Sequence, residues 1–369
     1  MVISRLVLGL GERQLRTDTA QLIIKKYMAD LTPLTAIGEF ALINRLQAGI
    51  TNRQPGTVLG IGDDAAIIAP TPGMELVMTT DLLVEGIHFD LAFCPLRHLG
   101  YKAVAVNVSD IAAMNALPTQ LVVALSAGPR FTVEAIEELY AGMRLACEAY
   151  NVDLVGGDTT ASRGGLTLAV TVLGEVPAGQ AVRRSGGKPT DLLCVSGDLG
   201  AAFLGLQVLE REKQAFLADP DTQPELENYE YVVQRQLRAE ARLDIVHELR
   251  ELGVRPTSMI DISDGLASEV LHLCAASGTG ARVFTEFLPM ANPTLEVAAE
   301  FNLDPITCAL NGGEDYELLF TVPVTDHEKL KNHPDITIIG HLTTADDGAN
   351  LVTKSGQAVP LQAQGWTSF

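Results

Sequence analysis

Short apolar segments that carry an aspartate recur at separated places along the chain. Four of them read as strands, and in each the aspartate stands near glycine, serine or threonine: VLGIGDDAAII (58–68), LVMTTDLLV (76–84), VDLVGGDTT (152–160) and SMIDISDG (258–265). Short apolar runs bounded by turn residues are typical of buried strands. Helical patterns at 100–118 and 132–150 alternate with them. This alternation predicts an α/β (α+β) fold.

The length and composition fit a two-domain enzyme. The chain has 369 residues, of which 47% are hydrophobic and 5% aromatic, so it can bury two cores. A turn-rich segment at 177–191 separates two strand-and-helix patterns. We expect an N-terminal extension at 1–36, an N-terminal domain at 37–177 and a C-terminal domain at 178–369. In the extension, Asp18 and Gln21 predict a capping box for a helix that runs to about Leu31.

Charge and cysteine content limit the partners and the compartment. The formal net charge of −20 argues against nucleic acid or an anionic membrane surface, because both would repel the protein. Five scattered cysteines without a CxxC pair are typical of a reduced, cytoplasmic protein. We expect no membrane span, since no apolar stretch reaches the length that one requires.

Several common catalytic motifs are absent or out of context. Gly60–Ala65 matches G-x-G-x-x-A, but its two adjacent carboxylates would repel a dinucleotide phosphate, and the sequence that follows is extended rather than helical. The nearest candidate for a Walker A loop, SGGKPT (185–190), lacks the leading glycine. Neither HExxH nor Gly-x-Ser-x-Gly occurs. These observations argue against Rossmann, P-loop, zinc-protease and serine-hydrolase chemistry.

The aspartates indicate divalent-metal phosphate chemistry. Any one of them could be a solvated turn residue or a helix cap. Asp110 is harder to explain in that way, because its helix is otherwise apolar and Asn107 lies one turn before it on the same face. Carboxylates that converge without a cation would raise one another's pKa. Oxygen ligands of this kind suit Mg²⁺, and oxygen atoms of substrate phosphates then complete its coordination shell.

Neighbouring residues in two further segments are expected to differ in role. If the backbone stays extended at Asp63 and Asp64, their side chains point to opposite sides. We therefore expect Asp64 to bind metal and Asp63 to support the turn. Arg183 and Arg184 are a candidate phosphate clamp in an acidic protein, and the sequence leaves open which of them contacts phosphate.

Local capping signals predict where helices end. Ser263 is the expected N-cap of a helix that ends at Gly278, and Pro118 is expected to end the helix that begins near residue 100. The segment 336–352 reads as a hairpin that turns at Asp347–Gly348.

Taken together, eight motifs closely resemble the thiamine-monophosphate kinases. They are GEFALINRL (38–46), GIGDDAAII (60–68), TTDLLVEGIHF (79–89), YKAVAVNVSDIAAM (101–114), GGDTT (156–160), RSGGKPTD (184–191), DISDGLASEVLHL (261–273) and NGGEDYELLF (311–320). The resemblance covers about residues 38–369, and the motifs keep their order. Asn115 stands where the family usually has glycine, and Asn311 where serine is common. The extension at 1–36 lies outside the pattern.

The resemblance implies a fold, an activity and a set of site residues. It implies two domains similar to the N- and C-terminal domains of aminoimidazole-ribonucleotide synthetase, and a homodimer formed through the N-terminal sheets. ATP would phosphorylate thiamine monophosphate to thiamine diphosphate. Several Mg²⁺ ions would be held by Asp64, Thr79, Thr80, Asp81, Asp110, Asp158, Asp261 and Asp264. ATP would face Gly157, Asp158, Arg184 and Ser263, and the thiamine side would face His88, Glu314 and Trp366.

Two alternatives stay open at this point. One is another ATP-dependent enzyme of the same superfamily, similar to aminoimidazole-ribonucleotide synthetase. The other is a catalytically silent nucleotide-binding protein. For His88, the simpler interpretation is a structural role. For Trp366, it is an exposed side chain without a function.

Overall fold

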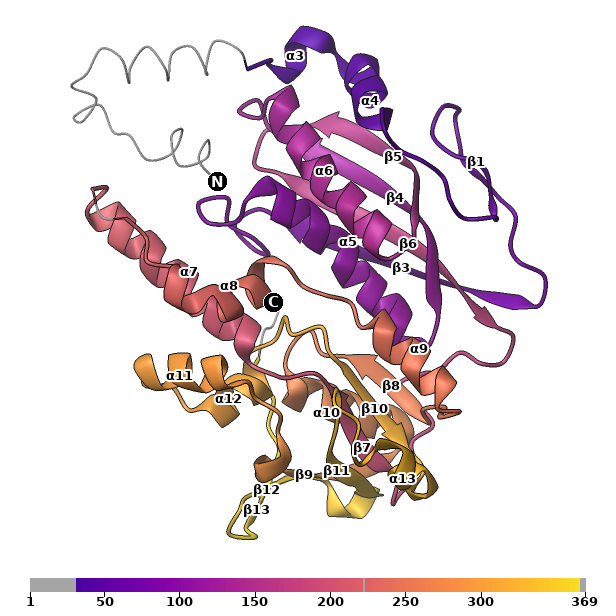
Figure 1. Ribbon diagram of the computed structural model, residues 1–369, viewed down its shortest axis with the longest axis vertical. Helices are drawn as coiled ribbons and strands as arrows, with labels where there is room; N and C mark the ends of the chain where they lie inside the picture. The colour runs from indigo at the N-terminus through magenta and orange to yellow at the C-terminus, as the bar shows by residue number, and fades with distance from the viewer. Residues whose placement is uncertain (1–30, 222, 366–369) are drawn as a thin grey trace.

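The computed structural model describes residues 31–221 and 223–365, and within them the chain folds around two larger β-sheets (Figure 1). The first sheet has four strands in the order β3-β6-β4-β5. These strands are β3 (Met74–Val84), β4 (Leu117–Ala127), β5 (Asp153–Ala161) and β6 (Thr167–Pro177). Helices α5 (Leu96–Ala113) and α6 (Val133–Ala149) pack together over one face of it. The elements before it are α3 (Leu34–Ile37), α4 (Glu39–Gln47) and a hairpin of β1 (Thr57–Leu59) and β2 (Ile67–Ile68).

The two faces of the four-stranded sheet are covered differently. On the face toward α5 and α6, Leu168 and Val170 of β6 are fully buried. On the other face Leu76, Met78 and Leu82 of β3 are 50%, 71% and 56% exposed. Successive side chains of a strand point to opposite faces, which accounts for this alternation. The sheet therefore has an open face that is rich in apolar side chains.

The second sheet has seven strands in the order β13-β12-β9-β11-β7-β10-β8. They are β7 (Leu192–Ser196), β8 (Ser258–Asp261), β9 (Thr279–Phe284), β10 (Leu318–Val322), β11 (Ile336–Thr344), β12 (Ala349–Val352) and β13 (Ala358–Pro360). The helices of this half are α7 (Ala201–Ala218), α8 (Glu230–Leu237), α9 (Leu243–Glu251), α10 (Leu266–Ser277), α11 (Asn292–Glu300), α12 (Pro305–Asn311) and α13 (His327–Leu330). Helix α5 contacts β3 and β6 of the first sheet and β8 of the second. This mixture of helices and sheets confirms the predicted α/β (α+β) class, and it places α5 at the junction of the two sheets.

The predicted start of α10 is wrong, whereas its predicted end is confirmed. The N-cap is Gly265 with φ 112°, not Ser263, and Gly278 ends the helix in the left-handed conformation. A Cβ atom at Gly265 would lie 2.8 Å from the carbonyl oxygen of Leu310, so the chain needs glycine there. The Ser263 carbonyl instead accepts a hydrogen bond from the Glu314 N–H at 2.7 Å. A contact between distant segments has overridden the local capping signal.

Pro118 does not end α5. The helix ends at its C-cap Met114, and Asn115 follows with φ 58°, a left-handed conformation that asparagine tolerates. Arg250 donates to the Asn115 carbonyl oxygen and so fixes this turn. Pro118 lies within β4 beside a shift in the register with β6, where the ladder is already irregular. Asn115 and Arg250 therefore form the end of this helix, and Pro118 has no part in it.

The predicted hairpin at 336–352 is also wrong. The turn exists, with Gly348 at φ 64°, but β11 and β12 do not pair with each other. Strand β9 lies between them, antiparallel to β11 and parallel to β12. The predicted helix from Asp18 to about Leu31 lies almost entirely outside the described residues.

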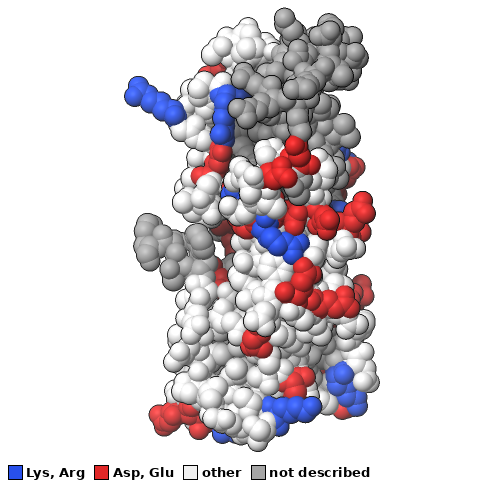
Figure 2. All heavy atoms as spheres, turned by 90° about the vertical axis from the view of Figure 1, so that its left-hand side faces the viewer, with Lys and Arg blue, Asp and Glu red and all other residues white. Residues whose placement is uncertain are grey.

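The surface reflects the acidic composition. On the face drawn in Figure 2, acidic side chains gather around the middle, and basic side chains are interspersed with them. Within the described residues, none of the helices combines the length and the apolar character that crossing a membrane requires.

Candidate active site

Three predicted aspartates come together from three separate elements. Asp81 lies in β3, Asp110 near the end of α5, and Asp261 at the end of β8. Thr79 Oγ1 donates to Asp110 Oδ2 at 2.5 Å, and Ser109 Oγ donates to Asp261 Oδ2 at 2.7 Å. The two hydrogen bonds thus connect α5 with β3 and with β8.

Each of these three carboxyl groups has a raised pKa. Burial, and after it the charge of Asp110, raise the pKa of Asp81 to about 6. Burial and then Asp110 raise the pKa of Asp261 to about 7. The pKa of Asp110 is also raised by burial, against the hydrogen bond from Thr79 and the charge of Arg184. Desolvation and mutual repulsion make this cluster costly to ionise unless a cation is present.

The turn after β8 adds two more carboxylates, one of which the sequence did not single out. Burial raises the pKa of Asp264, which the charges of His272 and Arg184 oppose. Glu269 in α10 is only 2% exposed, and burial raises its pKa to about 7. Glu269 Oε1 accepts the Asp264 N–H at 3.0 Å, so it shapes the turn. Arg184 acts electrostatically on Asp110, Asp264 and Glu269.

The segment Gly313–Glu317 closes over the turn after β8. The N–H groups of Glu314 and Tyr316 donate to Ser263 O at 2.7 Å and Ile262 O at 2.9 Å. Glu314 and Tyr316 have φ values of 58° and 52°, which non-glycine residues rarely adopt. Burial and the charges of Glu314, Asp261, Asp81 and Asp110 raise the pKa of the Tyr316 phenol well above its ordinary value. Tyr316, which sequence analysis also missed, therefore faces the carboxylate cluster.

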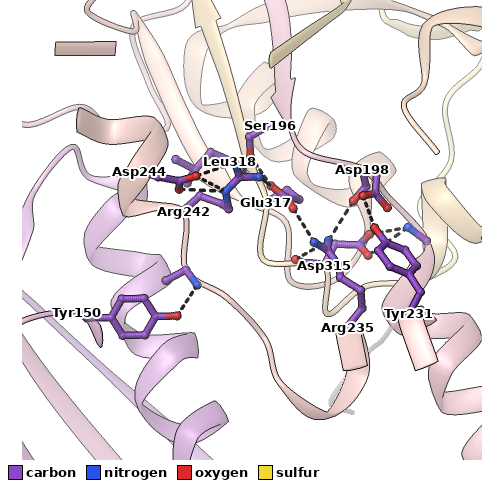
Figure 3. Close-up of polar contacts among 12 residues, drawn as sticks. Tyr150, Ser196, Asp198, Tyr231, Arg235, Arg242, Asp244, Asp315, Glu317 and Leu318 are labelled. Atoms are coloured by element: carbon purple, nitrogen blue, oxygen red, sulfur yellow. Dashed lines mark hydrogen bonds and ion pairs between the residues drawn. The ribbon is translucent and has the colours of Figure 1, made fainter. Parts of the chain in front are cut away.

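A buried ionic network fixes this segment from behind (Figure 3). Glu317 accepts from Arg235 at 2.9 Å, from Arg242 at 2.6 Å and from Ser196 at 2.5 Å. Asp315 accepts the Gly200 N–H with both oxygens, at 3.1 and 3.0 Å. Alternate residues thus have separate tasks: Asp315 and Glu317 anchor the segment, whereas Glu314 and Tyr316 point toward the candidate site.

Two predicted metal ligands lie on the other face of the sheet. Thr80 is paired with Thr171, and its side chain points to the open face. Asp158 in β5 is aligned with Ala124 of β4, whose side chain is also exposed on that face. Three strand spacings separate β5 from β3, a distance of about 14 Å. Within one chain, Thr80 and Asp158 are therefore not gathered with Asp81 and Asp110.

The remaining candidates have varied surroundings. Asp63 and Asp64 lie in the exposed loop between β1 and β2, where Asp63 Oδ1 accepts the Asp64 N–H at 2.9 Å. The loop is bent rather than extended, but Asp63 supports it as predicted.

His88 Nδ1 accepts the Val84 N–H at 3.0 Å in the turn after β3. At Gly157 a Cβ atom would lie 2.0 Å from Val123 O, so strand packing requires glycine. Trp366 lies outside the described residues.

The donor chemistry of the cluster fits a hard divalent cation. Carboxylate and hydroxyl oxygens are the ligands that Mg²⁺ prefers, and a cation would relieve the repulsion that raises the pKa values of Asp81 and Asp261. In residues 31–221 and 223–365, no three His, Cys, Asp or Glu side chains are already arranged as a metal site. The protein chain thus supplies suitable donors without a preformed cage, as expected where substrate phosphates complete the coordination.

Comparisons with known proteins show which family the chain resembles over nearly its whole length. Residues 62–176 match the family model "AIR synthase related protein, N-terminal domain". The chain is 33% identical to the thiamine-monophosphate kinase of Bacillus subtilis over 336 residues, which cover 90% of this chain and 99% of that protein. It is 36% identical to the Escherichia coli K12 enzyme of the same name over 342 residues, with the same coverage.

Solved structures of such kinases share the whole architecture. The thiamine-monophosphate kinase of Stenotrophomonas maltophilia K279a has a TM-score of 0.74 at 34% identity, covering 88% of this chain and 98% of that one. A structure described as "AaThiL complexed with AMPPCP and TMP" has a TM-score of 0.71 at 30% identity, covering 92% of this chain and all of that one. The similarity to relatives extends over both sheets and nearly the full length of each relative. The chain belongs to the thiamine-monophosphate kinase family.

Proposed function

We propose that this chain transfers the γ-phosphoryl group of ATP to the phosphate of thiamine monophosphate, which yields thiamine diphosphate. The observation that carries the proposal is the convergence of Asp81, Asp110 and Asp261 from β3, α5 and β8. The relatives of the same name and the similar structure with AMPPCP and TMP support it.

We further propose the ligands of the two substrates and of Mg²⁺. The metal ligands would be Thr79, Asp81, Asp110, Asp261 and Asp264 around the carboxylate cluster, and Asp64, Thr80 and Asp158 at separate metal positions. Residues facing ATP would be Gly157, Asp158, Arg184 and Ser263, and those facing the thiamine side would be His88, Glu314 and Trp366. When bound, Mg²⁺ would neutralise the repulsion between the two substrates' phosphates. Arg184, rather than Arg183, is the proposed phosphate contact, because its charge acts on Asp110, Asp264 and Glu269.

The protein's own groups then have to position the reactants. The acceptor phosphate is already ionised near neutral pH, so no strong general base is required. The hydroxyl groups of Thr79 and Ser109 fix the orientation of Asp110 and Asp261. The backbone pairing of Glu314 and Tyr316 with the turn after β8 fixes the opposite wall. Such an arrangement suits direct in-line transfer without a phosphorylated enzyme intermediate.

We also propose a homodimer that buries the open face of the four-stranded sheet. Leu76, Met78 and Leu82 are exposed there, and contiguous exposed apolar side chains mark interaction sites. Thr80 and Asp158 lie on the same face. A second copy packed on it would therefore cover these two residues and bring residues of two chains near one another.

Met78→Asp is expected to dissociate this dimer. A carboxylate in the centre of an apolar interface would lose its hydration without gaining a partner. The molar mass measured by light scattering after gel filtration should fall from two chains to one. Exposed Leu217 at the end of α7 gives a matched control, because Leu217→Asp should leave the mass unchanged. A dimer that persists in Met78→Asp would place the interface elsewhere.

The proposed domain boundaries and compartment follow the sequence. The domains would span residues 37–177 and 178–369, and β6 ends at Pro177 while β7 begins at Leu192. A cytoplasmic location is supported by five cysteines that are all free thiols.

The function is tested by a panel of acceptors incubated with ATP and Mg²⁺. Thiamine monophosphate should be phosphorylated, and neither selenide nor an aminoimidazole precursor should be consumed. Turnover of one of these alternatives without turnover of thiamine monophosphate would assign the chain to another activity of the superfamily.

A further inference from the structure

Lys102 is a buried lysine on α5 whose charge is balanced by one carboxylate. It is only 3% exposed. Its Nζ lies 2.8 Å from Glu314 Oε1 and donates to the Gln236 carbonyl oxygen at 3.2 Å. Fully buried lysines are rare because removing the ammonium group from water is costly, and they are kept where a partner holds them. The position of Lys102 therefore calls for an explanation in terms of Glu314.

Gln236 of α8 holds the second oxygen of the same carboxylate. Its Nε2 donates to Glu314 Oε2 at 2.6 Å. Lys102 and Gln236 thus fix both oxygens from two different helices, whereas the Glu314 side chain stays 31% exposed. A carboxylate held in this way cannot rotate, yet it still offers a free side to a ligand.

The backbone of Glu314 is constrained as strongly as its side chain. Its φ of 58° is in the left-handed region, and its N–H is tied to Ser263 O. Backbone strain of this kind persists where the surrounding structure over-determines it, and it clusters at functional sites. Main-chain and side-chain restraints together give one fixed direction to the Glu314 carboxylate.

We propose that Lys102, together with Gln236, is a positioning residue that orients Glu314 for recognition of the phosphoryl acceptor. The inference rests on the proposed role of Glu314 at the thiamine side. Thiamine monophosphate carries a cationic thiazolium ring and an aminopyrimidine with N–H donors, and a carboxylate is complementary to both. A fixed carboxylate binds such a ligand without an ordering cost.

Lys102 also distinguishes Glu314 from the neighbouring carboxylates. Asp110 repels both Asp81 and Asp261, and among the described residues none of the three forms a salt bridge with a lysine, a state that favours capture of a cation. Glu314 has its own counter-charge at 2.8 Å. The ion pair therefore reserves Glu314 for directional hydrogen bonding instead of metal binding.

The test compares steady-state constants of wild type, Lys102→Met, Glu314→Gln and the double variant. Losing a hydrogen-bonded charge partner is expected to raise KM for thiamine monophosphate about 10- to 100-fold in Lys102→Met. KM for ATP should stay near the wild-type value, because the polar contacts of Lys102 are with Glu314 and Gln236 and not with a residue proposed to face ATP. In the Glu314→Gln background, Lys102→Met should add little, since both changes act through one carboxylate.

Controls separate positioning from general loss of structure. Lys331→Met removes an exposed lysine with the same chemistry, and it should change neither KM. Gln236→Met removes the other restraint on Glu314 and should also raise KM for thiamine monophosphate alone. If Lys102→Met is not recovered as a folded protein, the Gln236→Met variant is used to test the inference in its place.

Several results would overturn the inference or the role of Glu314 on which it rests. Equal increases of KM for ATP and for thiamine monophosphate would show a structural role, and fully additive effects in the double variant would show that Lys102 does not act through Glu314. If Glu314→Gln alone left KM unchanged, the proposed role of Glu314 itself would be wrong. A raised KM in Glu314→Gln with wild-type constants in both Lys102→Met and Gln236→Met would contradict the positioning role of Lys102 and Gln236 but not the role of Glu314.

Discussion

Asp110→Asn is expected to stop turnover and at the same time to stabilise the protein in the absence of metal. After burial, the charge of Asp110 is the next largest cause of the raised pKa of both Asp81 and Asp261. Removing that charge eliminates the repulsion, and it also removes a donor proposed for Mg²⁺. We expect a loss in kcat of at least about 100-fold, as for other groups that stabilise developing charge. In EDTA at pH 8, the free energy of unfolding should rise by about 1–2 kcal/mol.

The gain in stability should depend on pH with a defined sign. The folded-state pKa values of Asp81 and Asp261 are raised to about 6 and about 7, above an unfolded value of 3.8. As pH rises from about 4 to about 7, the unfolded chain releases these protons before the folded chain does, so wild-type stability falls. The stabilisation by Asp110→Asn should consequently be larger at pH 8 than at pH 5.

Thermal unfolding in EDTA at the two pH values measures this difference. Asp346→Asn, in the exposed turn Ala345–Asp347, is the matched control and should unfold like the wild type. A metal-free Asp110→Asn protein that is less stable than wild type at pH 8 would show that the Thr79 hydrogen bond outweighs the repulsion. Undiminished activity would remove Asp110 from the proposed metal ligands.

Glu317→Ala is expected to destabilise the protein by about 3 kcal/mol or more, because breaking a buried ion pair leaves an uncompensated charge. The Glu317 side chain is 1% exposed and pairs with both Arg235 and Arg242 (Figure 3). Arg242 retains Asp244 at 2.8 Å, whereas Arg235 loses its only side-chain salt bridge within the described residues. Most of the cost should therefore come from Arg235.

Urea unfolding followed by circular dichroism measures this cost. Glu137→Ala is a suitable control, because Glu137 forms a half-exposed pair with Arg45 at 2.8 Å. It should change the free energy of unfolding by less than about 1 kcal/mol. Similar midpoints for Glu317→Ala and Glu137→Ala would mean that the network in Figure 3 does not hold the Gly313–Glu317 segment in place.

The sequence was sufficient to single out the features that depend only on residues close together in the chain. Asp81, Asp110 and Asp261 were singled out because apolar segments repeatedly carry an aspartate, and the family resemblance then implied the metal-binding roles that we propose for them. The helix end at Gly278 was predicted because a left-handed cap depends on one residue alone. These features need no knowledge of what packs against them.

The features that escaped prediction depend on distant segments. Glu269, Tyr316 and Lys102 gain their roles only when α10, the Gly313–Glu317 segment and α5 meet. In the same way, the Glu314 N–H donates a hydrogen bond to the Ser263 carbonyl oxygen, and strand β9 lies between β11 and β12. Local sequence patterns do not predict such contacts, because the two partners are far apart in the sequence.

The most direct measurement of the central claim follows γ-³²P-labelled ATP in the presence of Mg²⁺, with and without thiamine monophosphate. We predict that label appears in thiamine diphosphate when the acceptor is present, that Asp110→Asn shows almost no transfer, and that the protein itself is never labelled. Label bound covalently to the protein without acceptor would contradict direct transfer. A wild-type protein that binds ATP but never forms labelled thiamine diphosphate would contradict the proposed function.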